Sequence, residues 1–326
     1  MTPPSPTIEV TRLTKTYGSA RAIESLSFEV QPGEVVGFLG PNGAGKSTTM
    51  KILTGFMSAT SGRAQVAGFD VSTHPHDVQR RVGYLPERVG LYEEMLVADY
   101  LGFVCNIRGV ERARKRARIQ EVAQLTGLGP VMHKSTAQIS RGYRQRVGLA
   151  QAIIHEPDVV ILDEPTSGLD PNQIVDIREV IKTIGATKTV LFSTHIMQEV
   201  EAVCDRVLVL NRGQLVAQGS VDALRDQVAG ALPGALGLFK THEPGALLKL
   251  LGGVKGVDHV DVVDARATEI TVHLHTNQAA KVSERVANKM AQASGHTLLA
   301  QGARALSLEA IFRHLTQGHT QEQETP

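Results

Sequence analysis

The stretch Gly40-Pro41-Asn42-Gly43-Ala44-Gly45-Lys46-Ser47-Thr48 decides the fold of this chain. Its spacing fits G-x-x-x-x-G-K-[ST], the pattern of a loop that cradles phosphate groups. The apolar run at residues 35–39 before it is typical of a buried strand, and residues 46–54 after it can form a helix. A strand, a glycine-rich turn and a helix in this order predict a nucleotide-binding site.

The residue types of this loop suit phosphate chemistry. Glycines let the backbone turn so that several N–H groups face one anion, and the start of the helix adds about half a positive charge. We expect Lys46 to reach the β and γ phosphates and the hydroxyl of Ser47 to ligand Mg²⁺. A glycine-rich surface turn is the alternative, but it leaves the preceding strand, the spacing and the Lys-Ser pair unexplained.

Composition places few limits on the function. The 326 residues suit one large domain or two ordinary ones, and 42% hydrophobic residues are enough for a normal core. The net charge of +1 does not mark the whole chain as a binder of nucleic acid or membrane surfaces. The densest basic stretch, residues 108–118, contains no aromatic residue, so a solvated helix face is favoured over a phosphate-binding patch.

The chain shows no sign of secretion or membrane insertion. Cys105 and Cys204 are far apart, so disulfides do not organise the fold, which suits a reducing cytosol. Residues 1–6 lack the basic and apolar segments of a signal peptide. No uninterrupted apolar run approaches the roughly 18 residues that span a bilayer. We therefore expect any membrane role to come from a partner.

A second strong signal is the pair Asp163-Glu164, which follows the apolar run at residues 159–162. Two carboxylates at the end of a buried strand are costly unless they are functional or paired. Beside a phosphate loop, Asp163 would hold the magnesium through water, and Glu164 would orient and deprotonate the attacking water. Two exposed acids at a strand end are the weaker interpretation here.

Two further residues are candidates for nucleotide contacts. His195 follows a predicted strand at residues 189–193, at the sheet edge where open α/β folds bind ligands, and we predict a hydrogen bond from it to the γ-phosphate. Tyr17, upstream of the loop, either stacks on an adenine ring or packs on its neighbours in a turn.

Paired histidines invite comparison with metal sites. His273 and His275 share a predicted strand face, and His74 and His76 share a turn. No cysteine or acidic residue has a suitable spacing to either pair, so we interpret them as solvated side chains.

Strands alternate with helices along the first two thirds of the chain, which predicts a largely parallel sheet covered by helices. An antiparallel subsheet and a helical insert near residues 95–155 complete this first domain, residues 1–228. The small, proline-marked run at 229–235 is a predicted linker. Residues 236–316 predict a small α+β domain, a ferredoxin-like split βαβ unit followed by a helix. The polar residues 317–326 predict a disordered tail.

These residues together resemble the ATPase subunit of ATP-binding-cassette (ABC) transporters, over about residues 8–228. The resemblance implies a P-loop NTPase cassette that binds and hydrolyses ATP with Mg²⁺. Tyr17 matches the adenine-stacking aromatic, and Gly40 to Thr48 match the Walker A loop. Residues 159–164 match the Walker B strand with the catalytic Glu164, and residues 139–146 match the signature region. Residues 167–170 match the D-loop, with Asp170 at the nucleotide, and His195 matches the switch histidine.

The resemblance also implies partners. Two ATPase subunits, identical or paralogous, would pair head to tail, so that Ser140 and Gly142 of one complete the phosphate site of the other. A separate multi-span permease would hold the pair at the cytoplasmic face of the plasma membrane, and no nucleic acid is expected.

The chain departs from the family pattern at two places. The usual signature is Leu-Ser-Gly-Gly-Gln, and this chain has Ile139-Ser140-Arg141-Gly142-Tyr143. Ser140 and Gly142 retain the phosphate contact, while Arg141 either adds a cation near the γ-phosphate or points to solvent. The family's Q-loop glutamine is replaced by Glu87, which can ligand Mg²⁺ or sense its water but, when ionised, cannot donate a hydrogen bond.

Residues 83–87 and 91–95 resemble a bacterial exporter subgroup with separately encoded permeases, which includes drug-resistance exporters and gliding-motility-associated ATPases. Residues 307–312 resemble the C-terminal ending of that subgroup. A coupling helix of the permease would dock near residues 87–100, where Val89, Leu91, Tyr92 and Met95 face it or belong to the core.

Two other functions compete with transport. A soluble ABC ATPase that acts on nucleic acid or the ribosome usually carries tandem cassettes or long coiled-coil inserts, and this chain shows neither. A regulatory module with degenerate sites is disfavoured by the intact Lys46, Asp163, Glu164 and His195.

Overall fold

The computed structural model describes residues 5–231, 234–302 and 306–321. Its contacts divide the chain into two units, residues 1–218 and 219–326. The sequence placed residues up to 228 in the first domain. In the structure, however, helix α8 (Val221–Ala231) belongs to the second unit because it packs against α11 (Leu308–Gln321).

A six-stranded sheet forms the centre of the first unit. Its strand order is β10-β9-β3-β8-β7-β6, and the four neighbouring pairs from β9 to β6 are parallel. The strands are β3 (Val35–Leu39), β6 (Val82–Leu85), β7 (Val159–Asp163), β8 (Thr189–Thr194), β9 (Arg206–Asn211) and β10 (Gln214–Gly219). Strands β3 and β7 are buried at every position, as expected of parallel strands that are covered on both faces.

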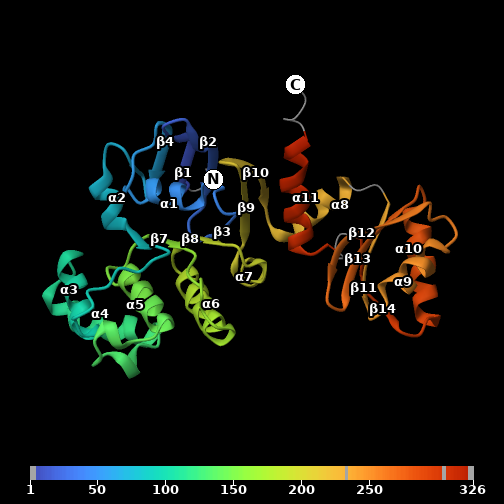
Figure 1. The fold of residues 1–326 in the computed structure, drawn as a ribbon. Helices are drawn as coiled ribbons and strands as arrows, with labels where there is room; N and C mark the ends of the chain where they lie inside the picture. Colours follow the sequence, from blue (N-terminus) through green and yellow to red (C-terminus); the bar gives the residue numbers. More distant parts are fainter. Residues whose placement is uncertain (1–4, 232–233, 303–305, 322–326) are drawn as a thin grey trace. The chain divides into compact units, whose positions relative to one another are not determined.

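Alternate residues of these strands enter two different cores. Val160 and Leu162 face a core with α5 and α6, whereas Val159 and Ile161 face a core with α1 and the antiparallel strands. Figure 1 shows α5 and α6 on the side of the sheet opposite β1, β2 and β4. The helices of this unit are α1 (Lys46–Leu53), α2 (Pro75–Arg81), α3 (Val97–Ile107), α4 (Arg112–Leu125), α5 (Arg141–Ile153), α6 (Pro171–Gly185) and α7 (Met197–Val203), with short 3₁₀ turns at Gly129–Val131 and Thr136–Gln138.

The predicted antiparallel subsheet is present, with longer strands than expected. Its order is β2-β1-β4-β5, formed by β1 (Ile8–Tyr17), β2 (Ala20–Val30), β4 (Ser61–Val66) and β5 (Phe69–Asp70). Strands β1 and β2 continue past the expected residues 8–13 and 23–30 until only Gly18 and Ser19 separate them. Tyr17 therefore ends a strand.

The basic stretch at residues 108–118 is not wholly a solvated face. Arg112, Arg114 and Arg116 are exposed, but Arg118 is only 7% exposed. Its Nε and Nη2 donate to the carbonyl oxygens of Ile154 (3.1 Å) and Ile153 (3.0 Å) at the end of α5. A guanidinium satisfies carbonyls that a helix leaves open at its C-terminus, so the expectation was wrong for Arg118.

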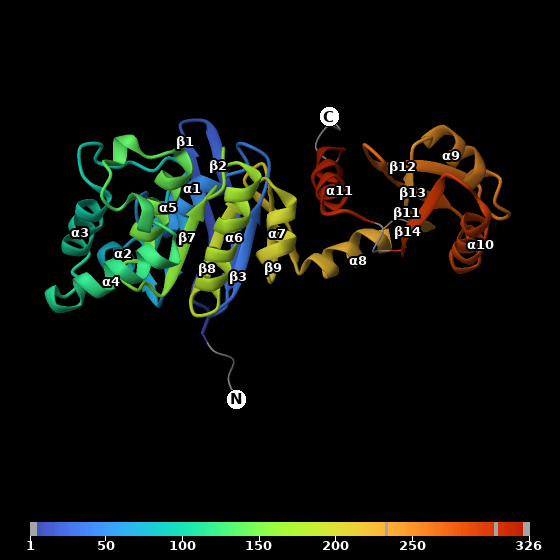
Figure 2. The ribbon, with the colours of Figure 1, turned by 90° about the horizontal axis from the view of Figure 1, so that it is seen from below.

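The second unit has the predicted ferredoxin-like topology. Chain order is β11-α9-β12-β13-α10-β14, sheet order is β12-β13-β11-β14, and every pair is antiparallel. The elements are β11 (Ala235–Thr241), α9 (Pro244–Gly252), β12 (His259–Arg266), β13 (Glu269–His275), α10 (Ala279–Gln292) and β14 (His296–Gln301). Helices α9 and α10 lie beside this sheet (Figure 2) and share a core with Phe239 and Val272.

The predicted linker and tail contain more regular structure than expected. Helix α8 runs to Ala231 and β11 begins at Ala235, which leaves residues 232–234 between them. Helix α11 continues to Gln321, because each residue added to an existing helix gains a hydrogen bond. Residues 232–233 and 322–326 of these two predictions lie outside the described residues. Within the described part of the chain, no helix combines the length and apolar character needed to cross a membrane.

Candidate functional site

The glycine-rich loop joins β3 to α1 in a conformation that requires glycine. Gly43 and Gly45 have φ of 83° and 100°, in the left-handed region that other residues avoid. A Cβ atom on Gly45 would lie 2.5 Å from the carbonyl oxygen of Ala22. Gly45 is the N-cap of α1 and provides no side-chain cap, so the first N–H groups of the helix remain available to an anion.

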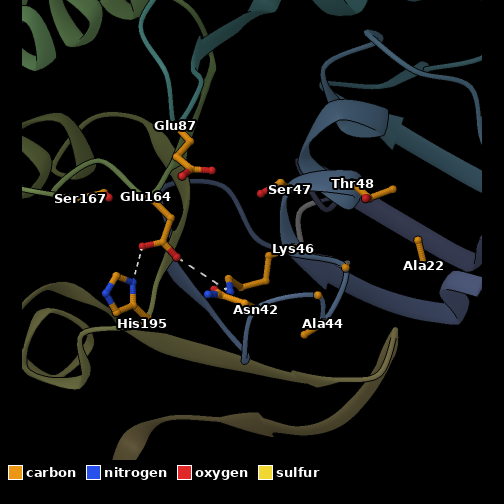
Figure 3. Close-up of a pocket in the computed structure, with 12 residues that line it drawn as sticks. Ala22, Asn42, Ala44, Lys46, Ser47, Thr48, Glu87, Glu164, Ser167 and His195 are labelled. Carbon is orange, nitrogen blue, oxygen red and sulfur yellow. Dashed lines mark hydrogen bonds and ion pairs between the residues drawn. The ribbon is translucent and has the colours of Figure 1, made fainter.

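The loop borders a cavity of about 440 Å³. Residues 42–48 form one wall, and the remaining lining residues are Ala22, Glu87, Glu164, Ser167 and His195. Figure 3 shows Glu87, Glu164 and His195 grouped opposite α1. The structure thus brings the loop together with three residues that the sequence predicted from distant segments. Gly40 and Pro41 lie at the base of the loop, where their carbonyls bind Lys46.

Lys46 is held over the loop by backbone oxygens. Its Nζ donates to the carbonyl oxygens of Gly40 (2.7 Å) and Pro41 (3.3 Å) and lies 3.9 Å from Oε1 of Glu164. Burial lowers the pKa of the Lys46 ammonium, and the carboxylates of Glu164, Asp163 and Glu87 oppose that shift. A bound polyphosphate would give this buried cation a stronger anionic partner.

Ser47, Asp163 and Ser193 form a hydrogen-bonded chain beside the loop. The hydroxyls of Ser47 (3.0 Å) and Ser193 (2.7 Å) both donate to Oδ1 of Asp163. Ser193 Oγ also accepts the N–H of Glu164 at 2.9 Å. Sequence reasoning gave Ser193 no role, although the β7–β8 register places it directly beside Asp163. The oxygens of Ser47, Asp163 and Glu87 are ligands of the type that Mg²⁺ prefers, so these residues fit the ion.

Glu164 and His195 form a second pair at the cavity wall. Glu164 has φ of 50°, unusual for a residue with a side chain, and its Oε2 accepts a hydrogen bond from Nδ1 of His195 at 2.7 Å (Figure 3). A neutral imidazole that donates through Nδ1 carries no proton on Nε2. His195 can therefore donate to a phosphate only as an imidazolium or after its bond to Glu164 breaks.

Besides Gly40 and Pro41, four of the predicted nucleotide contacts do not line this cavity: Tyr17, Ser140, Gly142 and Asp170. Tyr17 is 48% exposed and its hydroxyl contacts Sδ of Met57 at 2.8 Å. Asp170 caps α6 by accepting the N–H of Gln173 at 2.9 Å. In a single chain these residues are therefore separate from the phosphate loop.

The signature segment instead packs on the segment that follows Glu164. Ser140 caps α5 by accepting the N–H of Tyr143 at 3.4 Å. A Cβ on Gly142 would lie 2.4 Å from Oε1 of Gln173, and one on Gly168 would lie 2.3 Å from Cζ of Arg141. Arg141 is exposed, and its guanidinium thus lies beside the D-loop.

Sequence reasoning missed two lining residues. Ser167 falls inside the D-loop stretch, where its motif position was a usable signal. Ala22 has no chemical signature and reaches the cavity wall only because β2 passes beside the loop.

Comparison with known proteins places this site in a family. The family model described as "ABC transporter" matches residues 23–167. The ABC transporter ATP-binding protein NatA of Bacillus subtilis is 36% identical over 63% of this chain and 84% of its own length. The bacitracin transport ATP-binding protein BcrA of Bacillus licheniformis is 32% identical over 96% of this chain and 98% of its own length.

A solved structure gives the same answer for the fold. A structure described as the ATP-binding subunit of an ABC transporter is 32% identical, covers 68% of this chain and 93% of its own, and superposes with a TM-score of 0.63. The chain therefore belongs to the ATP-binding, ATP-hydrolysing subunits of ABC transporters.

Proposed function

We propose that the chain powers an exporter: two copies close head to tail on ATP and drive a separate membrane permease from its cytoplasmic face. The observation that supports head-to-tail pairing is the placement of Ser140 and Gly142. Ser140 is the exposed N-cap of α5 and Gly142 is buried in its first turn, and neither lines the cavity that contains the phosphate loop. A helix N-terminus without an anion is a suitable second half for the site of another copy.

The residues of one chain divide the work of hydrolysis. The loop N–H groups and Lys46 bind the β and γ phosphates, while Ser47, Asp163 and Glu87 would hold Mg²⁺. When bound, that ion would neutralise charge on the phosphates. Glu164 accepts a proton from the attacking water. At the same time the water oxygen bonds to the γ phosphorus, and the bond between that phosphorus and the leaving oxygen of ADP breaks. The contact of Glu164 with His195 holds the carboxylate toward the cavity.

A second hollow, of about 560 Å³, is the proposed docking place for the permease. Its wall includes Tyr92 and Ile107, which are 59% and 67% exposed, and Phe103, which packs edge-on against Tyr92. Val89, Leu91 and Met95, the other apolar residues of the predicted docking segment, pack partly against the core. Exposed aromatic and aliphatic side chains around a hollow suit an apolar helix.

The segment containing Pro86 and Glu87 connects the two hollows. Pro86 lines the proposed docking hollow, and the next residue, Glu87, lines the nucleotide cavity. A shift of Glu87 when the nucleotide or Mg²⁺ binds or leaves would therefore move the docking surface through the single peptide unit that joins it to Pro86. This adjacency supports coupling between ATP and the permease.

Export is the direction that the sequence resemblances favour. BcrA, named as a bacitracin transport ATP-binding protein, aligns with 96% of this chain. Residues 83–87, 91–95 and 307–312 resemble the exporter subgroup. A membrane-free complex of the purified chain with ribosomes or DNA would overturn the transport proposal in favour of a soluble ABC ATPase.

Replacing Glu164 by Gln tests the catalytic assignment. Loss of the general base should lower the ATP hydrolysis rate by about 10²–10⁴-fold. Nucleotide affinity should persist, because the amide leaves the phosphate loop intact, and ATP should trap the closed dimer on size-exclusion chromatography. Glu94→Gln, at an exposed acid outside the cavity, is the matched control. Hydrolysis by Glu164→Gln at the rate of the control would contradict the assignment.

Replacing Ile107 by Asp tests the docking surface. A charge on an exposed side chain of the docking hollow should abolish co-purification with the membrane permease, because a buried unpaired carboxylate is costly. ATP hydrolysis by the purified subunit should stay within about twofold of wild type, since small surface changes rarely affect a distant site. Unchanged permease binding by Ile107→Asp and by Tyr92→Ala would rule out this surface.

A further inference from the structure

Four polar side chains of the second unit gather on the β12–β13 hairpin. The strand register pairs His259 with His275 and Asp261 with His273. Directly paired residues of an antiparallel ladder place their side chains on the same face, as do residues two apart in one strand. All four side chains therefore share one face of the sheet.

This face is turned away from α9 and α10. Ile270, Val272 and Leu274 alternate with the histidines of β13 and pack into the core shared with those helices. Val260 packs against the same core from β12, so its neighbours His259 and Asp261 point to the other side. The cluster is thus separate from the hydrophobic core of the unit.

The nitrogen and oxygen atoms of this face are close together. One donor atom from each of Asp261, His273 and His275 lies within 4.8 Å of the other two. Nε2 of His275 donates to Oδ2 of Asp261 at 2.7 Å, and Nε2 of His259 lies 3.0 Å from Oδ1 of the same carboxylate. The ring centroids of His273 and His275 are 4.3 Å apart.

We propose that this face binds one divalent transition-metal ion of the zinc class through His273, His275 and Asp261, with His259 available for the fourth position. Imidazole and carboxylate are ligands of such ions. Metal bonds of about 2.0–2.2 Å place tetrahedral donors roughly 3.3–3.6 Å apart. The ion would replace the proton that now joins His275 to Asp261.

The burial of the ligands differs in a way that suits a preorganised site. His273 is 4% exposed and pairs on its other side with Leu236, which is also 4% exposed. One imidazole is therefore fixed, while Asp261 and His275 close the site from the solvent side. The sequence interpretation of His273 as solvated is wrong, whereas His275 is partly exposed as expected. The expectation that neither has an acidic partner is wrong for both, because the hairpin brings Asp261 to them.

Zinc titration of the untagged full chain, treated with chelator and kept nucleotide-free, tests the site. The titration is carried out in excess Mg²⁺, which fills oxygen-rich sites such as the cavity beside Ser47. Mg²⁺ competes poorly for imidazole ligands, so it leaves the histidine site open to Zn²⁺. We expect isothermal titration calorimetry to give one Zn²⁺ per chain, and Co²⁺ to give the visible absorption of a four-coordinate ion. Zn²⁺ should also raise the thermal unfolding midpoint.

Ligand variants identify the residues. His275→Ala and Asp261→Asn, both at the solvent side, should lower Zn²⁺ affinity by more than about 100-fold, beyond the loss typical of groups that only orient a ligand. His259→Ala should have a smaller effect. His242→Ala, an exposed histidine of the same unit, should bind like wild type. Absence of stoichiometric Zn²⁺ binding, or equal affinity in His275→Ala and Asp261→Asn, would overturn the proposal. Neither result bears on ATP hydrolysis.

Discussion

Ser193 shows how a residue outside every motif can control the geometry of a site. It is fully buried and joins Asp163 to the backbone N–H of Glu164 through one hydroxyl. Glu164 sits at a positive φ, a backbone state that persists only where surrounding contacts hold it. The hydroxyl of Ser193 provides one of those contacts.

Replacing Ser193 by Ala should therefore affect both stability and rate. It leaves a buried N–H without its partner, which costs about 1–3 kcal/mol of unfolding free energy. It also frees Glu164 to move, so hydrolysis should fall by about 10-fold or more, as expected when a catalytic group is misplaced. Urea unfolding and steady-state ATPase assays measure the two effects. Thr126→Val, which removes an equally buried hydroxyl that bonds only the carbonyl of Val122 in its own helix, outside the cavity, is the control. A rate like that of the control would exclude the positioning role.

Sequence patterns predicted the chemistry of single residues better than their partners. The motif spacing selected Lys46, Glu164 and His195, which the structure places around one cavity, and Asp163, which bonds Ser47 beside it. The hydrogen bond between His195 and Glu164 was not predictable, since it depends on where β7 and β8 end relative to each other. The metal-type cluster was missed because its acid, Asp261, reaches His273 only through the register of a hairpin.

At the scale of elements, His155 joins the end of α5 to the edge strand β6. Its Nε2 donates to the carbonyl oxygen of Val82 at 3.2 Å, and its Nδ1 has no partner among the described residues. Burial is the main cause that lowers the pKa of His155, to about 4, and the nearby guanidinium of Arg108 adds to it. The folded protein thus holds this imidazole neutral.

This contact should make stability depend on pH. Between about pH 6.5 and 4 the unfolded chain binds a proton that the folded chain excludes, so the unfolding free energy falls as the pH falls through that window. The loss contributed by His155 is about 3 kcal/mol at most, and it is complete near pH 4. Gln at position 155 can still donate to Val82 but does not titrate. Urea unfolding from pH 7 to 4 should show a shallower decline for His155→Gln, whereas parallel curves would refute the assignment.

At the scale of the whole molecule, the fold was largely predictable and the boundary between its parts was not. Alternating apolar strands and helices predicted the covered parallel sheet, and the strand pattern after residue 235 predicted the ferredoxin-like unit. The division after residue 218 was hidden because α8 is joined to its unit by contacts with α11, some 80 residues later. Sequence periodicity describes single elements and carries no information about such distant pairings.

Mixed dimers test whether two copies of the chain share each ATP site. Lys46→Ala removes the phosphate-binding cation, and Ser140→Asp adds a carboxylate to the exposed N-cap of α5, the proposed contact for the other copy's γ-phosphate. Each variant alone should lose nearly all hydrolysis. In a head-to-tail pair that contains one of each, one site carries both defects and the other carries none. An equal mixture should therefore regain about a quarter of the wild-type rate if the sites act independently.

The alternative arrangement predicts a different result for the same mixture. If each ATP were bound by the phosphate loop and signature segment of one chain, every chain in the mixture would carry one defect, and no activity would return. Mixing Lys46→Ala with Glu164→Gln is the control, because both changes lie in the same half of the site. In that mixture each site has one defect, so it should stay inactive under either arrangement. Recovery only with Ser140→Asp would show that one chain completes the site of the other.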